Sequence, residues 1–264
     1  AYNKAAKGNG FRDEFVYSQA EKDLLEKYAD ITGDPHTDLH ECVGHGSGKL
    51  LPGVDPDALK AYGSTIEEAR ADLFGLYYLP DKKLVELGLT PDEEAYKAEY
   101  YAYMMNGLLT QMVRIEPGCD LEEAHMRNRQ LIARWALENG KSMNVVELVQ
   151  KEGKTYVKIN DYTQLRKLFG RLLSEIQRIK SEGDYEVART LVEKYAVKLD
   201  VSLHEEVLAR YRALHLAPYK GFVNPVYRPE YDAEGRIVDV KVDYTEGYKE
   251  QMLRYGRDYS NLKI

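Results

Sequence analysis

Apolar residues recur at spacings of three and four along most of this chain, a periodicity typical of amphipathic helices. The segments SQAEKDLLEKYADI and TIEEARADLFGLYYL both follow it. Further helices are predicted over roughly 92–114, 121–139, 161–181, 184–197 and 202–214. The pattern therefore predicts a mainly α-helical fold.

Two of these helices begin with the spacing of a capping box, in which two polar side chains satisfy the first free backbone N–H groups. One pair is Ser18 with Glu21. The other pair is Ser64 with Glu67. We therefore expect helices to start at Ser18 and at Ser64.

A helix break is predicted between these two starts, at Gly33-Asp34-Pro35. Glycine is a poor helix former, and proline suits the first position of a new helix because its missing N–H is not needed there. We therefore expect a separate helix that opens at Pro35, carries TDLHECVGH and ends in the glycine-rich run 46–48.

Short stretches of alternating character predict a minor β element. They are KTYVKI at 154–159 and the segment 236–242. Proline and glycine become frequent after His215, which predicts an irregular C-terminal segment with a final helix over about 245–257. No internal repeat or flexible linker divides the sequence, so we expect one domain over 1–264.

Composition restricts the partners and the location of the protein. A formal net charge of −7 argues against nucleic acid and against an anionic membrane surface as partners. No apolar run reaches the roughly 18 residues of a membrane helix. The two cysteines, Cys42 and Cys119, form neither a disulfide framework nor a CxxC pair. We therefore expect a reducing, cytoplasmic location.

The segment HECVGH carries the clearest chemical signal. Two histidines four residues apart on a helix share a face and can bind one metal ion. His40 and His45 are five apart, which on a regular helix separates them by roughly 140°. A local π-bulge would absorb the extra residue, and Gly44 is the residue type most able to adopt a strained backbone there. The motif therefore predicts a bulged helix and a metal site.

A third metal ligand is expected from the helix that follows. Catalytic zinc usually has three protein ligands and one open position. Glu68 and Asp72 are four apart and share a face, so one can bind the metal while the other holds a ligand histidine from behind. Glu67 points away by about 100° and is expected only at the edge of the site.

Glu41 is the expected general base. It is adjacent to the ligand His40 and is not needed as a ligand itself. A carboxylate in that place can take a proton from a water that zinc has acidified. The predicted reaction is hydrolysis of a peptide bond without a covalent enzyme intermediate.

Simpler interpretations of the same residues remain open. HECVGH could be two surface histidines on an acidic helix, or part of a structural zinc site, although such sites are normally closed and rich in cysteine. His36 precedes His40 by four residues, but we expect it in the first turn of its helix, exposed or capping. Cys42 is expected to pack and to make the site sensitive to mercurials or oxidation.

HECVGHGSGKL followed by EEARAD resembles the dipeptidyl peptidase III family, zinc exopeptidases marked by HExxGH and EExxA(D/E). The short interval between the motifs is similar to the bacterial, Bacteroides-type branch. The resemblance implies that His40, His45 and Glu68 hold one zinc ion per chain. It also implies that Glu41 is the catalytic base.

The same resemblance extends to residues around the metal. It implies that Glu67 and Asp72 hold the ligand histidines from behind. The segment EAHMRNRQLIARW (124–136) resembles the part of the family that has a histidine in an AHM context. It implies that His125 lies near the zinc and stabilises the substrate or the developing negative charge. Arg129 shares its face and is a candidate for substrate binding.

The family releases dipeptides from the N-termini of short peptides and has two lobes around a wide cleft. The resemblance covers only its helical, zinc-binding lobe, so we expect an excised catalytic lobe with weak activity or none. Its expected partners are short peptide substrates and the missing N-terminal β-barrel lobe. Two alternatives stay open: an aminopeptidase or endopeptidase with the same metal chemistry, and a non-catalytic, zinc-stabilised module that binds peptides.

Overall fold

Amphipathic helices build most of the computed structural model, which describes residues 9–216 and 223–260. The mainly α fold that the apolar periodicity predicts is confirmed. The chain forms two compact units, Gly10–His215 and a second unit that contains the described residues 223–260. The sequence pattern predicts one domain instead, because no linker is visible in it.

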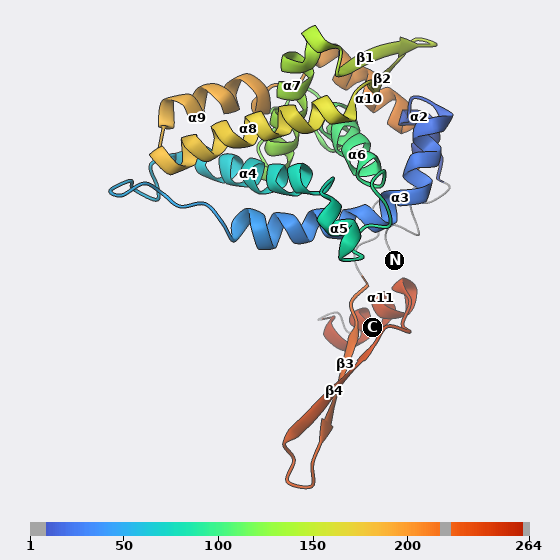
Figure 1. The fold of residues 1–264 in the computed structure, drawn as a ribbon. Helices are drawn as coiled ribbons and strands as arrows, with labels where there is room; N and C mark the ends of the chain where they lie inside the picture. Colours follow the sequence, from blue (N-terminus) through green and yellow to red (C-terminus); the bar gives the residue numbers. More distant parts are fainter. Residues whose placement is uncertain (1–8, 217–222, 261–264) are drawn as a thin grey trace. The chain divides into compact units, whose positions relative to one another are not determined.

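Helix α4 (Gly63–Tyr78) is the central element of the first unit. Figure 1 shows α8 (Tyr162–Glu182) and α3 (Gln19–Asp38) running beside it on opposite sides. Helix α7 (Ala124–Gly140) packs against α4 as well, and α6 (Tyr96–Leu108) packs against α3 and α7. Nine of the 16 residues of α4 are buried, so this helix is enclosed on several sides and not on one face alone.

Shorter elements complete the first unit. They are α2 (Phe11–Phe15), α5 (Lys82–Glu86), α9 (Tyr185–Val192), α10 (Val201–Ala213), the 3₁₀ turns η2 (Lys60–Tyr62), η3 (Thr110–Arg114) and η4 (Lys141–Met143), and the π-helical segments η1 (Leu39–His45) and η5 (Glu193–Val197). The five helical ranges predicted after residue 90 are confirmed to within a few residues, and the first of them is divided at Leu109.

Helix α3 continues through the break that was predicted at Gly33-Asp34-Pro35. Pro35 lies inside the helix and is buried. The next residue, His36, packs so closely on α4 that a Cβ at Gly75 would lie 2.2 Å from its ring. We infer that this packing outweighs the hydrogen bond lost at proline, which by itself would end a helix. The predicted break is therefore wrong.

The two predicted capping boxes differ in outcome. Ser18 is the N-cap of α3, but its hydroxyl donates to the Glu21 carboxylate and not to a backbone N–H. The box at Ser64 is wrong, because α4 begins at Gly63. The carboxylate of Glu67 does not reach back to the helix start and instead binds side chains on other elements.

Two antiparallel strands form a hairpin in the first unit. β1 (Val146–Lys151) pairs with β2 (Lys154–Ile159), and the predicted strand at 154–159 is confirmed. The two turn residues, Glu152 and Gly153, have φ values of 54° and 75°. Turns with two positive φ angles match the twist of a two-residue hairpin. The sequence analysis missed β1.

The second unit contains another hairpin and a helix. β3 (Val226–Tyr231) pairs with β4 (Ile237–Asp243), and α11 spans Tyr248–Tyr259. The predicted strand and final helix are confirmed, whereas β3 was missed because Pro229 indicated a loop. Proline is tolerated in a strand with a free edge. No helix in the described parts of the chain is long and apolar enough to cross a membrane.

A buried charge cluster joins α2, β2 and α10. Arg210 donates to Glu14 Oε1 at 2.7 Å and to the backbone oxygen of Thr155 at 2.6 Å. Glu206, one turn earlier, accepts from Arg210 at 2.9 Å. The side chains of Arg210 and Glu14 are only 6% and 15% exposed. Burial raises the pKa of Glu14, but Lys154 and Arg210 outweigh it, and the pKa is lowered.

Replacing Glu14 by glutamine should therefore lower the free energy of unfolding by about 1–3 kcal/mol at pH 7, since a charged hydrogen-bond acceptor becomes neutral. The Glu14 pKa is lower in the folded chain than in the unfolded chain. The contribution of the Glu14 carboxylate to the free energy of unfolding is complete above its unfolded pKa of about 4.3. It is lost as the pH falls through the pKa of the folded chain.

Urea unfolding at several pH values measures this effect. The difference between the wild type and Glu14→Gln should shrink below about pH 4. The exposed Glu205, on the same helix as Arg210, gives the control Glu205→Gln, which should change little at any pH. A Glu14→Gln difference that does not depend on pH would contradict the role of the ionised carboxylate.

Candidate metal centre

The HECVGH motif lies in the π-helix η1 (Leu39–His45), which continues directly from α3. Hydrogen bonds in a π-helix join residues five apart, so such residues come to lie on the same face. The rings of His40 and His45 accordingly have their centroids 4.7 Å apart. The predicted bulge is confirmed, and it extends over the whole motif.

Gly44 serves a different purpose from the one predicted. A strained backbone was expected there, but its φ is not positive. A Cβ at Gly44 would lie 2.7 Å from the Cα of Ala71 on α4. Glycine is therefore required at this position because the backbone of η1 lies directly against the backbone of α4.

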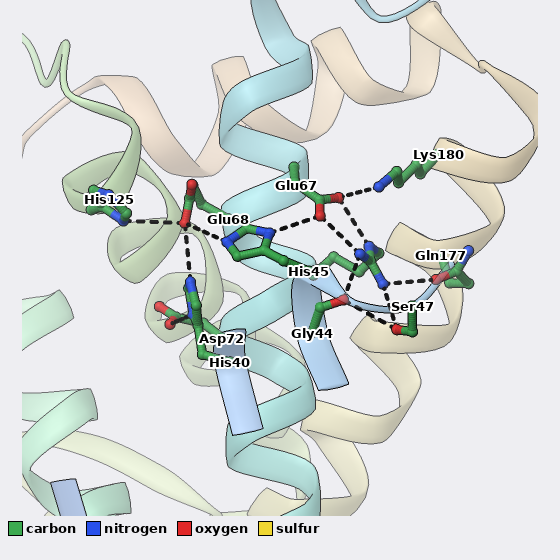
Figure 2. A network of polar contacts seen from close by, with 11 residues as sticks. His40, Gly44, His45, Ser47, Glu67, Glu68, Asp72, His125, Gln177 and Lys180 are labelled. Atoms are coloured by element: carbon green, nitrogen blue, oxygen red, sulfur yellow. Dashed lines mark hydrogen bonds and ion pairs between the residues drawn. The ribbon is translucent and has the colours of Figure 1, made fainter. Parts of the chain in front are cut away.

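Glu68 on α4 completes a cluster with the two histidines. Its Oε2 lies 3.4 Å from His40 Nε2 and 3.7 Å from His45 Nε2. One ligand atom from each of the three residues lies within 4.8 Å of the other two. Glu68 Oε2 is buried and has no hydrogen-bond partner. Figure 2 shows the three side chains converging, an arrangement that could hold a metal ion.

The outer ring nitrogens of the two histidines are each held by a carboxylate. His40 Nδ1 bonds Asp72 Oδ1 at 2.7 Å, and His45 Nδ1 bonds Glu67 Oε1 at 2.9 Å. Such bonds fix the tautomer, so that Nε2 of each ring presents its lone pair toward the cluster. Glu67, which its helix position predicted only at the edge and the family resemblance predicted behind a histidine, thus contacts His45.

The charges around these carboxylates keep them ionised. Burial raises the pKa of Glu67, but hydrogen bonds from Arg70 and Lys180 outweigh it and lower the pKa to about 2. Burial also raises the pKa of Asp72, and the bond from His40 outweighs it, so the pKa is lowered. The same bond raises the pKa of His40. Both acids are therefore strong hydrogen-bond acceptors near neutral pH.

Arg70 is a residue that the sequence analysis missed. Its side chain is completely buried and donates to both oxygens of Glu67, at 2.8 Å and 3.0 Å. It also donates to the backbone oxygen of Gly44 at 2.7 Å and to Ser47 Oγ at 3.1 Å. Arg70 therefore connects the end of η1 to α4 through hydrogen bonds. The only signal in the sequence was its place three residues after Glu67.

His36 differs from the expectation of an exposed or capping residue. It lies inside α3, is buried, and its Nδ1 bonds Glu99 Oε1 of α6 at 2.8 Å. Burial lowers the pKa of His36, but the bond to Glu99 and the charge of Asp72 outweigh it and raise the pKa to about 9. Tyr103 of α6 donates to the free oxygen of Asp72 at 2.8 Å. No motif in the sequence pointed to either Glu99 or Tyr103.

The structure leaves the side chains of Glu41 and Cys42 exposed on η1. The negative charge of Glu41 contributes, after Asp72 and Glu68, to raising the pKa of His40. The thiol of Cys42 is free. Both side chains are thus accessible from solvent beside the cluster, whereas packing was expected for Cys42.

His125 reaches the cluster from the first turn of α7. Its Nδ1 lies 3.2 Å from Glu68 Oε2, while 51% of the side chain stays exposed. Arg129 lies one turn further along α7. Within the described residues it makes no hydrogen bond or ion pair with the three clustered side chains. The structure therefore brings His125 to the site, whereas Arg129 forms no polar contact with the cluster among the described residues.

Comparison with known proteins identifies relatives of this chain. Residues 56–224 match the family described as Peptidase family M49. The chain is 25% identical to dipeptidyl peptidase 3 of Rattus norvegicus over 75% of its own length and 33% of that protein. It is also 25% identical to dipeptidyl peptidase 3 of Dictyostelium discoideum, over 95% of its own length and 42% of that protein. The resemblance drawn from the two motifs is confirmed.

Solved structures share the fold. The structure of DPP III from Caldithrix abyssi superposes with a TM-score of 0.60 at 24% identity, covering 80% of this chain and 37% of that one. The structure of dipeptidyl-peptidase III from Corallococcus sp. strain EGB gives a TM-score of 0.59 at 20% identity, covering 78% of this chain and 35% of that one. This chain thus spans well under half the length of these proteins.

Replacing Arg70 by methionine should lower the free energy of unfolding by about 1–3 kcal/mol, because the half-buried Glu67 carboxylate loses the two bonds from Arg70 and keeps only Lys180 and His45. Arg189→Met is the matched control, since Arg189 pairs with Glu186 on the surface and is 52% exposed. That control should cost less than about 1 kcal/mol. Equal effects of the two substitutions in urea unfolding would contradict the assigned role of Arg70.

Proposed function

Because this chain belongs to peptidase family M49, we propose that it carries the catalytic centre of a zinc-dependent exopeptidase that releases dipeptides from the N-termini of oligopeptides. The proposal takes its reaction from the relatives named dipeptidyl peptidase 3. The proposed catalytic roles are assigned to side chains on η1, α4 and α7.

The convergence of His40 Nε2, His45 Nε2 and Glu68 Oε2 carries the proposal. Two imidazoles and one carboxylate are the ligand set of several catalytic zinc sites, which leave a fourth position open. Glu68 Oε2 is buried among three imidazole nitrogens and makes no hydrogen bond, which supports the assignment, because a buried carboxylate oxygen without a hydrogen bond is costly unless a cation neutralises it. The set fits one zinc ion, with Asp72 and Glu67 holding the histidines from behind.

Glu41 is assigned as the general base. When bound, zinc supplies Lewis-acid polarisation of the scissile carbonyl and lowers the pKa of water. The exposed carboxylate of Glu41, next to His40, accepts the proton of the attacking water and delivers it to the leaving amine.

His125 and Arg129 are assigned to the substrate. His125 is half-exposed and touches Glu68, so its ring can donate a hydrogen bond to the carbonyl oxygen as negative charge develops. Arg129, four residues further along α7, is assigned to substrate binding beyond the reacting bond. The family resemblance further implies a β-barrel lobe as the partner that closes the peptide-binding cleft.

Purified protein should hold about one zinc ion per chain, as a three-ligand catalytic site does. Removing the metal with a chelator should lower the melting temperature, because zinc binds the folded chain in preference to the unfolded one. Metal analysis and thermal unfolding measure both effects. Less than half an equivalent of zinc, with no recovery after zinc is added, would exclude the site.

Replacing Glu41 by glutamine should lower the rate of hydrolysis of a dipeptidyl chromogenic substrate by about 10²–10⁴-fold, since the proton acceptor is lost. Bound zinc should stay unchanged, because Glu41 is not assigned as a ligand. Glu116→Gln changes the charge equally at an exposed position away from the motifs and serves as control. Full activity of Glu41→Gln would show that Glu41 is not the base.

A further inference from the structure

A second histidine–carboxylate pair lies behind the metal cluster, and the catalytic proposal does not use it. His36 of α3 and Glu99 of α6 are joined through Nδ1 and Oε1 at 2.8 Å. Their side chains are only 11% and 16% exposed. A buried ion pair with a single strong bond is weak evidence for stability, because desolvation opposes the attraction. The position of the pair relative to Asp72 suggests another use.

The position of the His36 ring is tightly determined by its surroundings. On one side, α4 has a glycine at position 75, where a Cβ would lie 2.2 Å from His36 Cδ2 and 2.8 Å from Nε2. On another side, the ring of Tyr103 meets it edge to face, with centroids 5.8 Å apart. Glu99 holds the remaining nitrogen. The ring therefore has little freedom to rotate or to shift.

The edge of this ring faces Asp72. His36 Nε2 lies 3.8 Å from Asp72 Oδ1, the same oxygen that bonds His40 Nδ1 at 2.7 Å. The other oxygen of Asp72 accepts from Tyr103 at 2.8 Å. His36 Nε2 has no hydrogen-bond partner of its own. The Asp72 carboxylate is thus set between two imidazoles, one of which belongs to the cluster.

We propose that His36 and Glu99 are positioning residues for the metal ligand His40, acting through Asp72, and that they raise the affinity of the site for zinc. The inference rests on the proposed zinc site and adds to it a layer of side chains beyond the acids that touch the ligands. In this proposal, the contacts that orient His40 continue from Asp72 on α4 through His36 to Glu99 on α6.

The physical reason is the orientation of one carboxylate. Outer side chains that orient a ligand histidine change metal affinity, typically by about 10–100-fold. Asp72 can hold His40 in the metal-binding tautomer only while its own plane is fixed. The rigid ring of His36 limits movement on the Oδ1 side, and Tyr103 fixes the Oδ2 side. Glu99 keeps the His36 ring from turning away.

Zinc affinity of the purified chain provides the test, measured by competition with a chelating indicator. His36→Asn and Glu99→Gln should each weaken zinc binding by about tenfold, at the lower end of outer-residue effects. His204→Asn is the matched control. His204 is also a buried histidine, but it bonds the backbone oxygens of Met112 and Ile115. The control should leave zinc affinity unchanged even where it lowers the melting temperature.

A double-mutant cycle distinguishes positioning through Asp72 from a general loss of structure. In an Asp72→Asn background, His36→Asn should change zinc affinity by less than about twofold, because coupled residues are not additive. An unchanged affinity in both His36→Asn and Glu99→Gln would overturn the inference. So would an equal loss with and without Asp72. If His36→Asn does not fold, Glu99→Gln decides by the same criteria.

The same experiment separates this inference from the proposed function. Failure of the wild-type chain to bind zinc would overturn the proposed metal site and this inference with it. Zinc binding by the wild type, with normal affinity in the two outer variants, would overturn only the positioning role of His36 and Glu99.

Discussion

The candidate site depends on one close approach between two backbones. The π-helix η1 lies against α4 so closely that Gly44 leaves no room for a Cβ beside Ala71. This contact sets the two histidines of η1 against the acidic face of α4. Because α4 is enclosed by α3, α7 and α8, the acids are presented from a rigid element. Sites built on such elements hold their geometry better than sites on loops.

Layers of polar side chains surround the two histidines of the cluster. Each histidine of the cluster has its own acid, and each acid has a further partner. On the His45 side the partner is Arg70, which binds Glu67 and the end of η1. On the His40 side it is His36, which faces Asp72. These partners satisfy the hydrogen-bonding groups of the buried carboxylates, which would otherwise be costly to bury.

The candidate metal site lies entirely within the first unit. The clustered side chains and His125 all lie in the first unit and are positioned by contacts within it. Those contacts bring together three side chains that could hold a metal ion. The chain spans only 33% to 42% of the length of the two curated relatives named above.

The sequence alone indicated most of the helices, the bulged motif and the residues of the candidate cluster, because each depends on the spacing of residues along one element. It could not decide that α3 runs through Pro35 or that Gly44 is needed for a close approach, since both follow from packing on α4. Nor could it find Arg70 or Glu99 as partners of the site. Which carboxylate reaches which ring nitrogen depends on how the helices dock, and only the tertiary structure decides that.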